Sequence, residues 1–214
     1  MSLDKTREKL LLATLPHVPF DGWSEAALRA GAEDAGLTAA EALNAIPGGP
    51  AEAVSLFSGW ADGRMLARLE KKDLASMKVR DKVAAGVRLR LEALEPHREA
   101  VRRSLAFLAM PQHAGLGLSC LHRTVNAIWY MAGDRATDYN YYTKRLLLAG
   151  VLSSTTLFWL NDRSKDHAAT WAFLDRRIDE VLKVGGRLGK TVKSLLDLPD
   201  RVMARRATRD GARR

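Results

Sequence analysis

Apolar residues recur at helical spacing along most of this chain, and we find no convincing strand. Val83, Val87, Leu91 and Leu94 share one face of the segment over residues 79–94, as expected for a helix that buries one stripe against a core. Pro residues are few, and long segments are rich in Ala, Leu, Arg and Glu, which favour helix. The pattern predicts an all-α fold.

Helix boundaries can be predicted at the start of the chain. A first helix over residues 4–15 ends at Pro16, and residues 19–22 form a turn. Ser24 is a natural N-cap because its hydroxyl can accept from a free backbone N–H of the next helix. That second helix ends near Gly36.

A short third helix is predicted from Ala39. Thr38 precedes Glu41 by three residues, the spacing of a reciprocal capping box. Two helices around a tight glycine turn outline a helix-turn-helix head. The segment AAEALNAI, however, has no Lys or Arg and carries Glu41. A DNA-reading helix surrounds its base contacts with cations, so we predict a degenerate head that does not bind DNA.

Six further helices are predicted along the rest of the chain. The fifth of these has no charge in its middle, and we expect it to be surrounded by other helices. Pro96 opens the third, since proline is favoured in the first turn of a helix. The helices cover residues 51–69, 79–94, 96–110, 116–132, 139–160 and 167–181.

Charge divides the chain into three predicted parts. Residues 1–63 carry four Lys and Arg against nine Asp and Glu, a net charge of −5, so the remaining residues carry 30 − 16, or +14. We predict a degenerate helix-turn-helix head over 1–63, an apolar helical body over 64–182, and a basic tail over 183–214. A basic surface is attracted to anionic membranes and to nucleic acid alike.

The tail has the pattern of a helix that lies on an anionic membrane. Ten basic residues against three acidic ones give residues 183–214 a net charge of +7. An apolar stripe with a cationic border favours the membrane interface, whereas the alternative is a solvated end that is disordered after Asp200. The predicted membrane contacts are Arg187, Leu188, Lys190, Val192, Lys193, Leu195 and Leu196.

No constellation of residues predicts catalysis. The five histidines form neither a His-x-x-x-His nor a Glu-x-x-His pair, and neither a phosphate-binding glycine loop nor a Gly-x-Ser-x-Gly elbow occurs. We therefore predict a protein that is not an enzyme and that holds no cofactor and no metal. Cys120 is the single cysteine, which fits a reducing compartment. No export signal and no spanning helix are predicted, so we expect a cytoplasmic protein that is peripheral on the inner face of the cytoplasmic membrane.

The segment DRATDYNYYTKRLLLAGVLSSTTLFWLNDRSKDHAATWAFLDRRIDEVL resembles the ubiquinone-biosynthesis lipid-binding family, the ninth protein of the coenzyme Q set. The resemblance continues backwards through PHREAVRRSLAFLAMPQHAGLGLSCLHRTVNAIWYMAGD and covers about residues 79–182. It implies a TetR-like homodimer that holds an isoprenoid or another lipid. It also implies that the protein presents quinone precursors to the di-iron demethoxyubiquinone hydroxylase.

The resemblance further implies where that hydroxylase docks. The matching positions lie on the helix before the Asp-Tyr-Asn corner and on the corner itself. Ile128 and Met131 are three residues apart and can share one face, and we expect some of these apolar groups to be exposed. Ordinary core packing is the alternative. The positions are Asn126, Ile128, Trp129, Met131, Asp138, Tyr141, Tyr142 and Arg145.

The predicted lipid cavity lies between the hairpin over 106–121 and the charge-free helix over 146–160. Small residues such as Gly117 and Ser153 would leave room for a ligand, whereas a dry, packed core is the alternative. The predicted lining residues are Leu108, Leu116, Leu118, Leu147, Val151, Thr155 and Phe158.

Two other functions remain compatible with the pattern. One is a TetR-type transcriptional regulator that senses a lipid effector, and the acidic head argues against it. The other is a scaffold without a ligand that bridges a membrane-bound enzyme complex.

Overall fold

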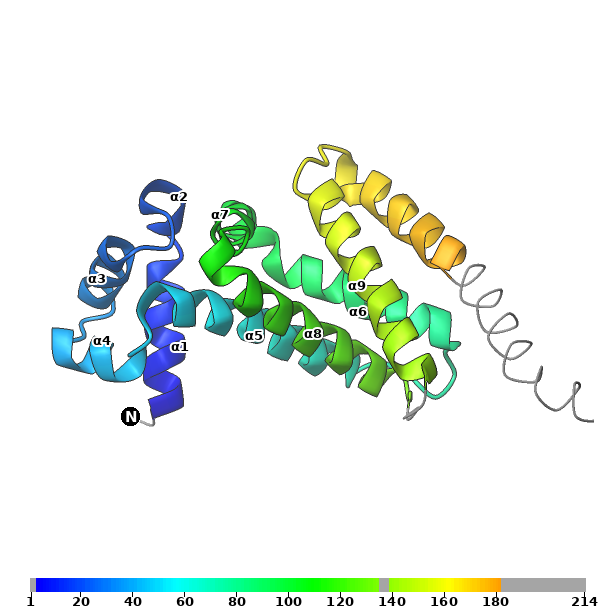
Figure 1. The fold of residues 1–214 in the computed structure, drawn as a ribbon, viewed down its shortest axis with the longest axis horizontal. Coiled ribbons are helices and arrows are strands. Elements are labelled where there is room, and N and C mark those ends of the chain that lie inside the picture. Colours follow the sequence, from blue (N-terminus) through cyan, green and yellow to red (C-terminus); the bar gives the residue numbers. More distant parts are fainter. Residues whose placement is uncertain (1–2, 135–138, 182–214) are drawn as a thin grey trace, which may run out of the picture.

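The computed structural model describes residues 3–134 and 139–181. The regular elements in this part of the chain are all helices, with no strand among them, which confirms the all-α prediction. Figure 1 shows the small head of α1 to α4 beside a longer body. The elements are α1 (Leu3–Thr14), α2 (Val18–Asp21), α3 (Glu25–Asp34), α4 (Ala39–Ala45), α5 (Gly49–Leu69), α6 (Val79–Leu94), α7 (Arg98–Leu108), α8 (Ala114–Met131), α9 (Tyr139–Trp159) and a helix from 168 to the last described residue, 181.

The capping residues of the head begin helices at the positions that the sequence predicts. Ser24 Oγ accepts from the backbone N–H of Ala27 at 3.2 Å. Thr38 and Glu41 form the reciprocal capping box at the start of α4, and the hydrogen bonds from the Thr38 backbone and hydroxyl lower the pKa of the Glu41 carboxyl. The predicted turn over residues 19–22 is wrong, because the Val18–Asp21 segment forms the single-turn helix α2.

A glycine fixes how closely the first and third helices cross. A Cβ at Gly31 on α3 would lie 2.3 Å from Thr14 Oγ1 and 2.7 Å from Thr14 Cα on α1. Only glycine allows this approach, since the clash is with backbone as well as with a side chain. The helices α1 and α3 of the head are therefore tightly packed against each other.

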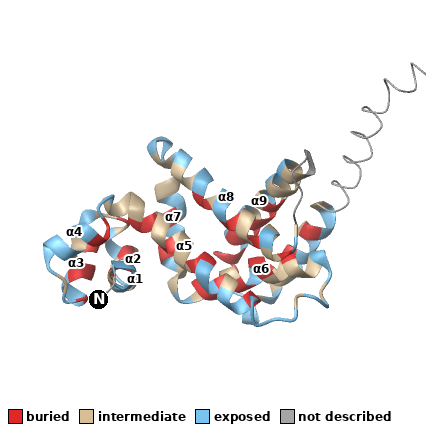
Figure 2. Cartoon of the chain, turned by 90° about the horizontal axis from the view of Figure 1, so that it is seen from below, coloured by how far each residue is buried: buried red, intermediate tan, exposed pale blue. Residues whose placement is uncertain are grey.

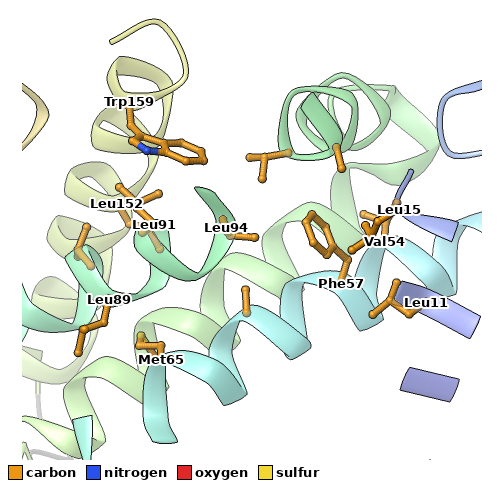
Figure 3. Packing of buried hydrophobic residues seen from close by; sticks show 14 of the residues in the cluster. Leu11, Leu15, Val54, Phe57, Met65, Leu89, Leu91, Leu94, Leu152 and Trp159 are labelled. Atoms are coloured by element: carbon orange, nitrogen blue, oxygen red, sulfur yellow. The ribbon is translucent and has the colours of Figure 1, made fainter. Parts of the chain in front are cut away.

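The helix α5 joins the head to the body. It runs through residue 63 without a break, so both parts share this one helix. Its buried face carries Val54, Phe57 and Met65, and it packs on α1, α6 and α8. The buried apolar residues form one core cluster, which includes Leu11 in the head and Trp159 on α9; Figure 3 shows part of it.

A second connection fastens the head to α7. Trp23 Nε1 donates to Ser104 Oγ at 2.9 Å, and Arg103 Nη2 donates to the carbonyl oxygen of Pro19 at 2.8 Å. Pro96 lies in the turn of 3₁₀ helix over Glu95–His97, and α7 itself begins two residues later than predicted.

The expectation that α9 is surrounded is wrong for one of its faces. Leu148, Val151, Leu152 and Trp159 are buried, but Leu146 is 74 % exposed within this chain. Exposed positions recur along the same helix at 150, 153 and 157. The other helices of the described chain therefore cover only part of α9.

The end of α9 is held by the start of α7. Arg98 donates to the carbonyl oxygens of Trp159 and Asp162, and Arg102 Nη2 donates to that of Leu160 at 2.8 Å. Arginines thus satisfy carbonyl groups that a helix end leaves free. None of the helices in the described part of the chain is both long and apolar enough to cross a membrane.

Candidate functional site

An apolar cavity of about 340 Å³ lies among α5, α6, α7, α8 and α9. This volume lies within the usual range for small-molecule pockets. Most of its wall is aliphatic, and Gly117 and Ser153 leave space where larger side chains would fill it. Aliphatic lining comes from Val54, Leu94, Val101, Leu105, Leu108, Ala109, Leu121, Leu152 and Leu157.

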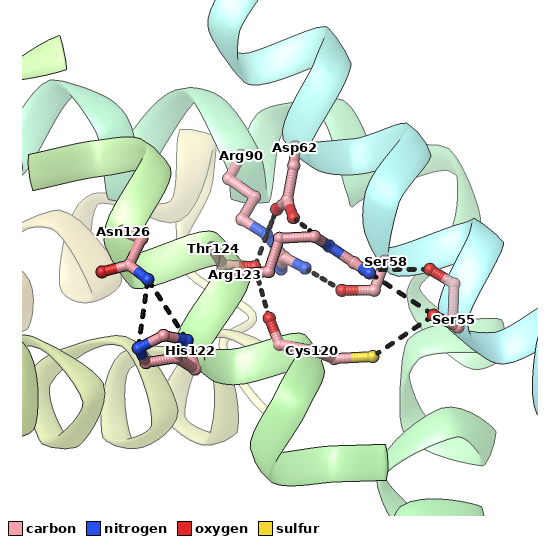
Figure 4. Close-up of polar contacts among 9 residues, drawn as sticks. All are labelled: Ser55, Ser58, Asp62, Arg90, Cys120, His122, Arg123, Thr124 and Asn126. Carbon is pink, nitrogen blue, oxygen red and sulfur yellow. Dashed lines mark hydrogen bonds and ion pairs between the residues drawn. The ribbon is translucent and has the colours of Figure 1, made fainter. Parts of the chain in front are cut away.

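A polar cluster forms part of the cavity wall. Buried Asp62 on α5 accepts hydrogen bonds from Arg90 Nε and Thr124 Oγ1, each at 2.8 Å. Arg90 Nη2 also donates to Ser58 Oγ at 3.1 Å. Figure 4 shows these groups converging from three helices. Arg90, Ser58 and Thr124 line the cavity, so an apolar ligand would meet donors and acceptors in this part of the wall.

Arg123 extends this polar cluster toward the surface. Its Nε lies 3.4 Å from Asp62 Oδ2, and its Nη2 donates to the carbonyl oxygen of Ser55 at 3.0 Å. The two arginines and one carboxylate sum to a charge of +1. The cluster is therefore suited to oxygen atoms of a ligand head group rather than to a cation.

A second arrangement of polar and aromatic groups lies near the C-terminal end of α8. Arg145 on α9 bonds Asn126 on α8 and lies 3.3 Å from Asp134 Oδ2, while its guanidinium stacks over the ring of Tyr141. Lys144 Nζ contacts Asp134 Oδ1 at 2.7 Å. This cluster fixes the α8–α9 corner, and its interactions hold charged groups in place around a nearly buried carboxylate.

Exposed aromatic rings lie at this corner. Tyr142 is 72 % exposed, and its ring packs edge-on against Tyr141 with centroids 5.1 Å apart. Tyr130 on α8 is also exposed. Rigid aromatic area on an ordered support is typical of protein interfaces.

Residues 114–185 of this chain match the family model of COQ9. The chain is 36 % identical over 193 residues to the ubiquinone biosynthesis protein COQ9, mitochondrial, of Drosophila melanogaster, covering 88 % of this chain and 59 % of that protein. The corresponding proteins of rat and human are 34 % and 32 % identical over 200 residues each, with 90 % of this chain and 64 % and 62 % of theirs. This chain belongs to the COQ9 family. It spans about three fifths of the length of these curated relatives.

A TetR transcriptional regulator from Nitrosomonas europaea has a similar fold. Its crystal structure superposes with a TM-score of 0.69, over 82 % of this chain and 97 % of the regulator, at 19 % sequence identity. The TetR-like fold expected from the resemblance is therefore confirmed. At this identity the likeness concerns the fold alone.

The cavity lies between the predicted segments of this COQ9 family member, but on other faces of them. Leu108 lines it, as predicted. Val151 and Thr155 are buried but lie outside the lining, and Leu118 is exposed on α8. Phe158 stacks on Phe173 instead, with centroids 4.6 Å apart, and Leu116 and Leu147 are half-buried outside the cavity.

Sequence reasoning missed the α9 residues that do line the cavity. They are Leu152, Ser153, Thr156 and Leu157, adjacent to those predicted. Because one residue turns a helix by about 100°, the right segment with the wrong rotation selects the wrong face. The positions of α7 and α8 decide that rotation, and the sequence of α9 alone does not contain them.

Several of the partner positions predicted for the family lie together. Arg145 contacts both Asn126 and Tyr141, and Trp129 Nε1 donates to the carbonyl oxygen of Lys144 at 3.2 Å. Ile128 follows the alternative of core packing, since it is 1 % exposed and packs on Gly86. Met131 and Trp129 are half-buried.

The remaining predicted residues lie outside the described chain. These are Asp138 and all the predicted membrane contacts of the tail: Arg187, Leu188, Lys190, Val192, Lys193, Leu195 and Leu196. Among the residues that the structure does describe, no three His, Cys, Asp or Glu side chains are grouped so that they could hold a metal ion.

Proposed function

We propose that this protein is a non-catalytic accessory protein of ubiquinone biosynthesis. It holds an isoprenoid or quinone lipid in the cavity and presents it to the di-iron demethoxyubiquinone hydroxylase. The cavity carries this proposal, because a mostly aliphatic wall that includes Arg90, Ser58 and Thr124 suits a lipid with oxygen atoms at its head. The COQ9 relatives support it, since their name places them in that pathway.

Organic extraction of the purified protein followed by mass spectrometry tests the cavity. We expect an isoprenoid quinone precursor from the natural chain. Ser153→Phe places a ring at the cavity wall and should remove most of that lipid. Ser119→Phe is the matched control, because Ser119 is exposed on α8 outside the cavity. Natural protein without lipid, or equal lipid in both variants, would contradict the proposal.

The α8–α9 corner is the proposed docking site for the hydroxylase. Tyr142 provides exposed aromatic area, and the ion pairs of Asp134 with Lys144 and Arg145 hold its surroundings in place. Tyr142→Ala should weaken binding of the hydroxylase about tenfold or more, the effect of losing an aromatic hot spot. Phe20→Ala removes an even more exposed ring from the head and should leave binding unchanged.

Membrane attachment and dimerisation complete the proposal. The basic tail over 183–214 would lie on an anionic membrane, at the cytoplasmic face of the cytoplasmic membrane, and two chains would pair through the exposed side of the last body helices. Removing residues 183–214 should greatly weaken binding to anionic vesicles. Unchanged binding would discard this role of the tail.

A lipid-sensing transcriptional regulator is the second candidate, favoured by the superposition on a TetR regulator. The helix α4, however, presents no Lys or Arg and has Glu41 in its first turn, which would repel phosphates. Tight, sequence-specific binding to a promoter fragment would establish this alternative. We expect none.

A further inference from the structure

The hairpin between α7 and α8 has an exposed, charge-free tip, which we define as residues 104–119. No Asp, Glu, Lys or Arg occurs from Ser104 to His122. Leu118 is 69 % exposed, and Leu105 and Met110 are 37 % exposed. In Figure 2 this hairpin stands out from the body and is coloured mainly as exposed and intermediate. Soluble surfaces rarely leave so long a segment both exposed and uncharged.

The charges beside the hairpin tip are mostly positive. Four arginines lie beside the tip, at 98, 102, 103 and 123, and they pair with three carboxylates, those of Glu95, Glu99 and Asp62, which gives 4 − 3 or +1. Arg103 is about half exposed, and it shares Glu99 with Arg102. An apolar tip with a cationic border matches an anionic bilayer, in which acyl chains receive the tip and phosphates meet the arginines.

The hairpin tip and the cavity are continuous. Leu105, Leu108, Ala109 and Gly117 belong to the tip and also line the cavity. Across from them, Leu157 on α9 lines the cavity and is 56 % exposed. The cavity therefore opens beside the tip, and a lipid could enter it without crossing water.

We propose that the hairpin tip inserts into the surface of an anionic lipid bilayer and turns the mouth of the cavity toward the membrane. This contact is separate from the one proposed for the basic tail. It uses a different segment, and it positions the opening of the cavity rather than only attaching the chain. The identity of the molecule in the cavity is the only part of this inference that rests on the proposed function.

A dye on the hairpin tip gives a local test with the full-length chain. Gln112→Cys, labelled with a polarity-sensitive dye, places the reporter at the tip, and both labelled chains also carry Cys120→Ser because Cys120 lines the cavity. Leu43→Cys on α4 is the matched control, an exposed site in the head. The vesicles contain phosphatidylcholine and phosphatidylserine in equal parts, with some chains carrying a quencher.

We expect a blue shift and quenching of the dye at residue 112 and neither change at residue 43. Attachment through the tail cannot produce this pattern. A dye at residue 112 that stays in water on vesicle-bound protein would overturn the proposal, as would equal changes at both sites. A lipid-free cavity would contradict the proposed function but not this inference, because the dye reports only on the tip.

Charged substitutions provide a second test. Met110→Asp combined with Leu118→Asp should lower vesicle affinity about tenfold or more, since two apolar side chains no longer enter the bilayer. Both sites are exposed, so the melting temperature should stay near that of the natural chain. Leu43→Asp should leave vesicle affinity unchanged. Normal vesicle binding with loss of self-association or of hydroxylase capture would make the tip a protein interface and overturn the proposal.

Discussion

The two ends of α8 present different kinds of exposed surface. At its start, the hairpin tip is apolar and uncharged, with Leu118 exposed. At its end, exposed Tyr142 stands beside a framework in which Asp134 pairs with Lys144 and Arg145. A fluid bilayer needs no directional contacts, whereas a protein partner needs fixed ones. This difference is the basis for proposing a lipid contact at one end of α8 and an enzyme contact at the other.

The comparison predicts that mutations at the two ends of α8 differ in their effect on the free energy of unfolding. Ile128→Glu should have the largest effect, with a loss of about 4 kcal/mol or more in the free energy of unfolding. The charge would be buried beside Gly86 without a partner. Chemical denaturation monitored by circular dichroism measures the loss. A stable, folded variant would show that the partner end of α8 is not anchored in the core.

Asp134→Ala should have the second largest effect, with a loss of about 3 kcal/mol in the free energy of unfolding, because it leaves the nearly buried Arg145 without its carboxylate partner. Lys144 is more exposed and can turn to water. The same denaturation experiment measures it, and hydroxylase binding should fall as the corner loses its order. If stability is unchanged, the ion pairs do not order this corner.

Asp162, which lies away from both ends of α8, makes the stability of the fold depend on pH. Burial raises the pKa of its carboxyl, but hydrogen bonds from Thr170 and Ser164 outweigh burial and hold the pKa below its ordinary value. A lowered pKa stabilises the fold above the unfolded value, about pH 4, and this stabilisation is lost as the pH falls toward the folded value.

Asp162→Asn should therefore destabilise the protein by about 1–3 kcal/mol at pH 7 and flatten the decline of stability below pH 4. Denaturation at a series of pH values measures both. Asp21→Asn is the control at an exposed aspartate and should change neither. An unchanged acid decline in Asp162→Asn would contradict the role of these hydrogen bonds.

Leu118→Asp should have the smallest effect on stability, within about 0.5 kcal/mol, because its side chain is already in water. The same substitution should weaken vesicle binding. A large loss of stability would show that the hairpin tip is packed rather than free. Thermal melting without vesicles distinguishes the two results.

Local chemistry could be predicted from the sequence, and the faces of the long helices could not. Ser24 and the pair Thr38 and Glu41 act within one turn of chain, so their capping bonds form as expected. Leu152 and Val151 are neighbours on α9, yet only Leu152 lines the cavity. Which of them does so depends on where α7 and α8 pack, and periodicity alone does not specify that.

The corner shows the same limit for the partner site. The segments of α8 and α9 that the resemblance names do meet, since Arg145 bonds Asn126, but the resemblance left open whether Ile128 is exposed, and Ile128 is buried. A position three residues from Met131 can face either the core or the partner. The glycine at 86 decides this, because it leaves room on α6 for the Ile128 side chain.

The most direct test is capture of the demethoxyubiquinone hydroxylase by the natural chain and by Ser153→Phe and Tyr142→Ala, with lipids extracted from each sample. The account predicts hydroxylase and isoprenoid together for the natural chain. Ser153→Phe should lose the lipid but keep the enzyme, and Tyr142→Ala should lose the enzyme but keep the lipid. Capture of neither by the natural chain would contradict the account.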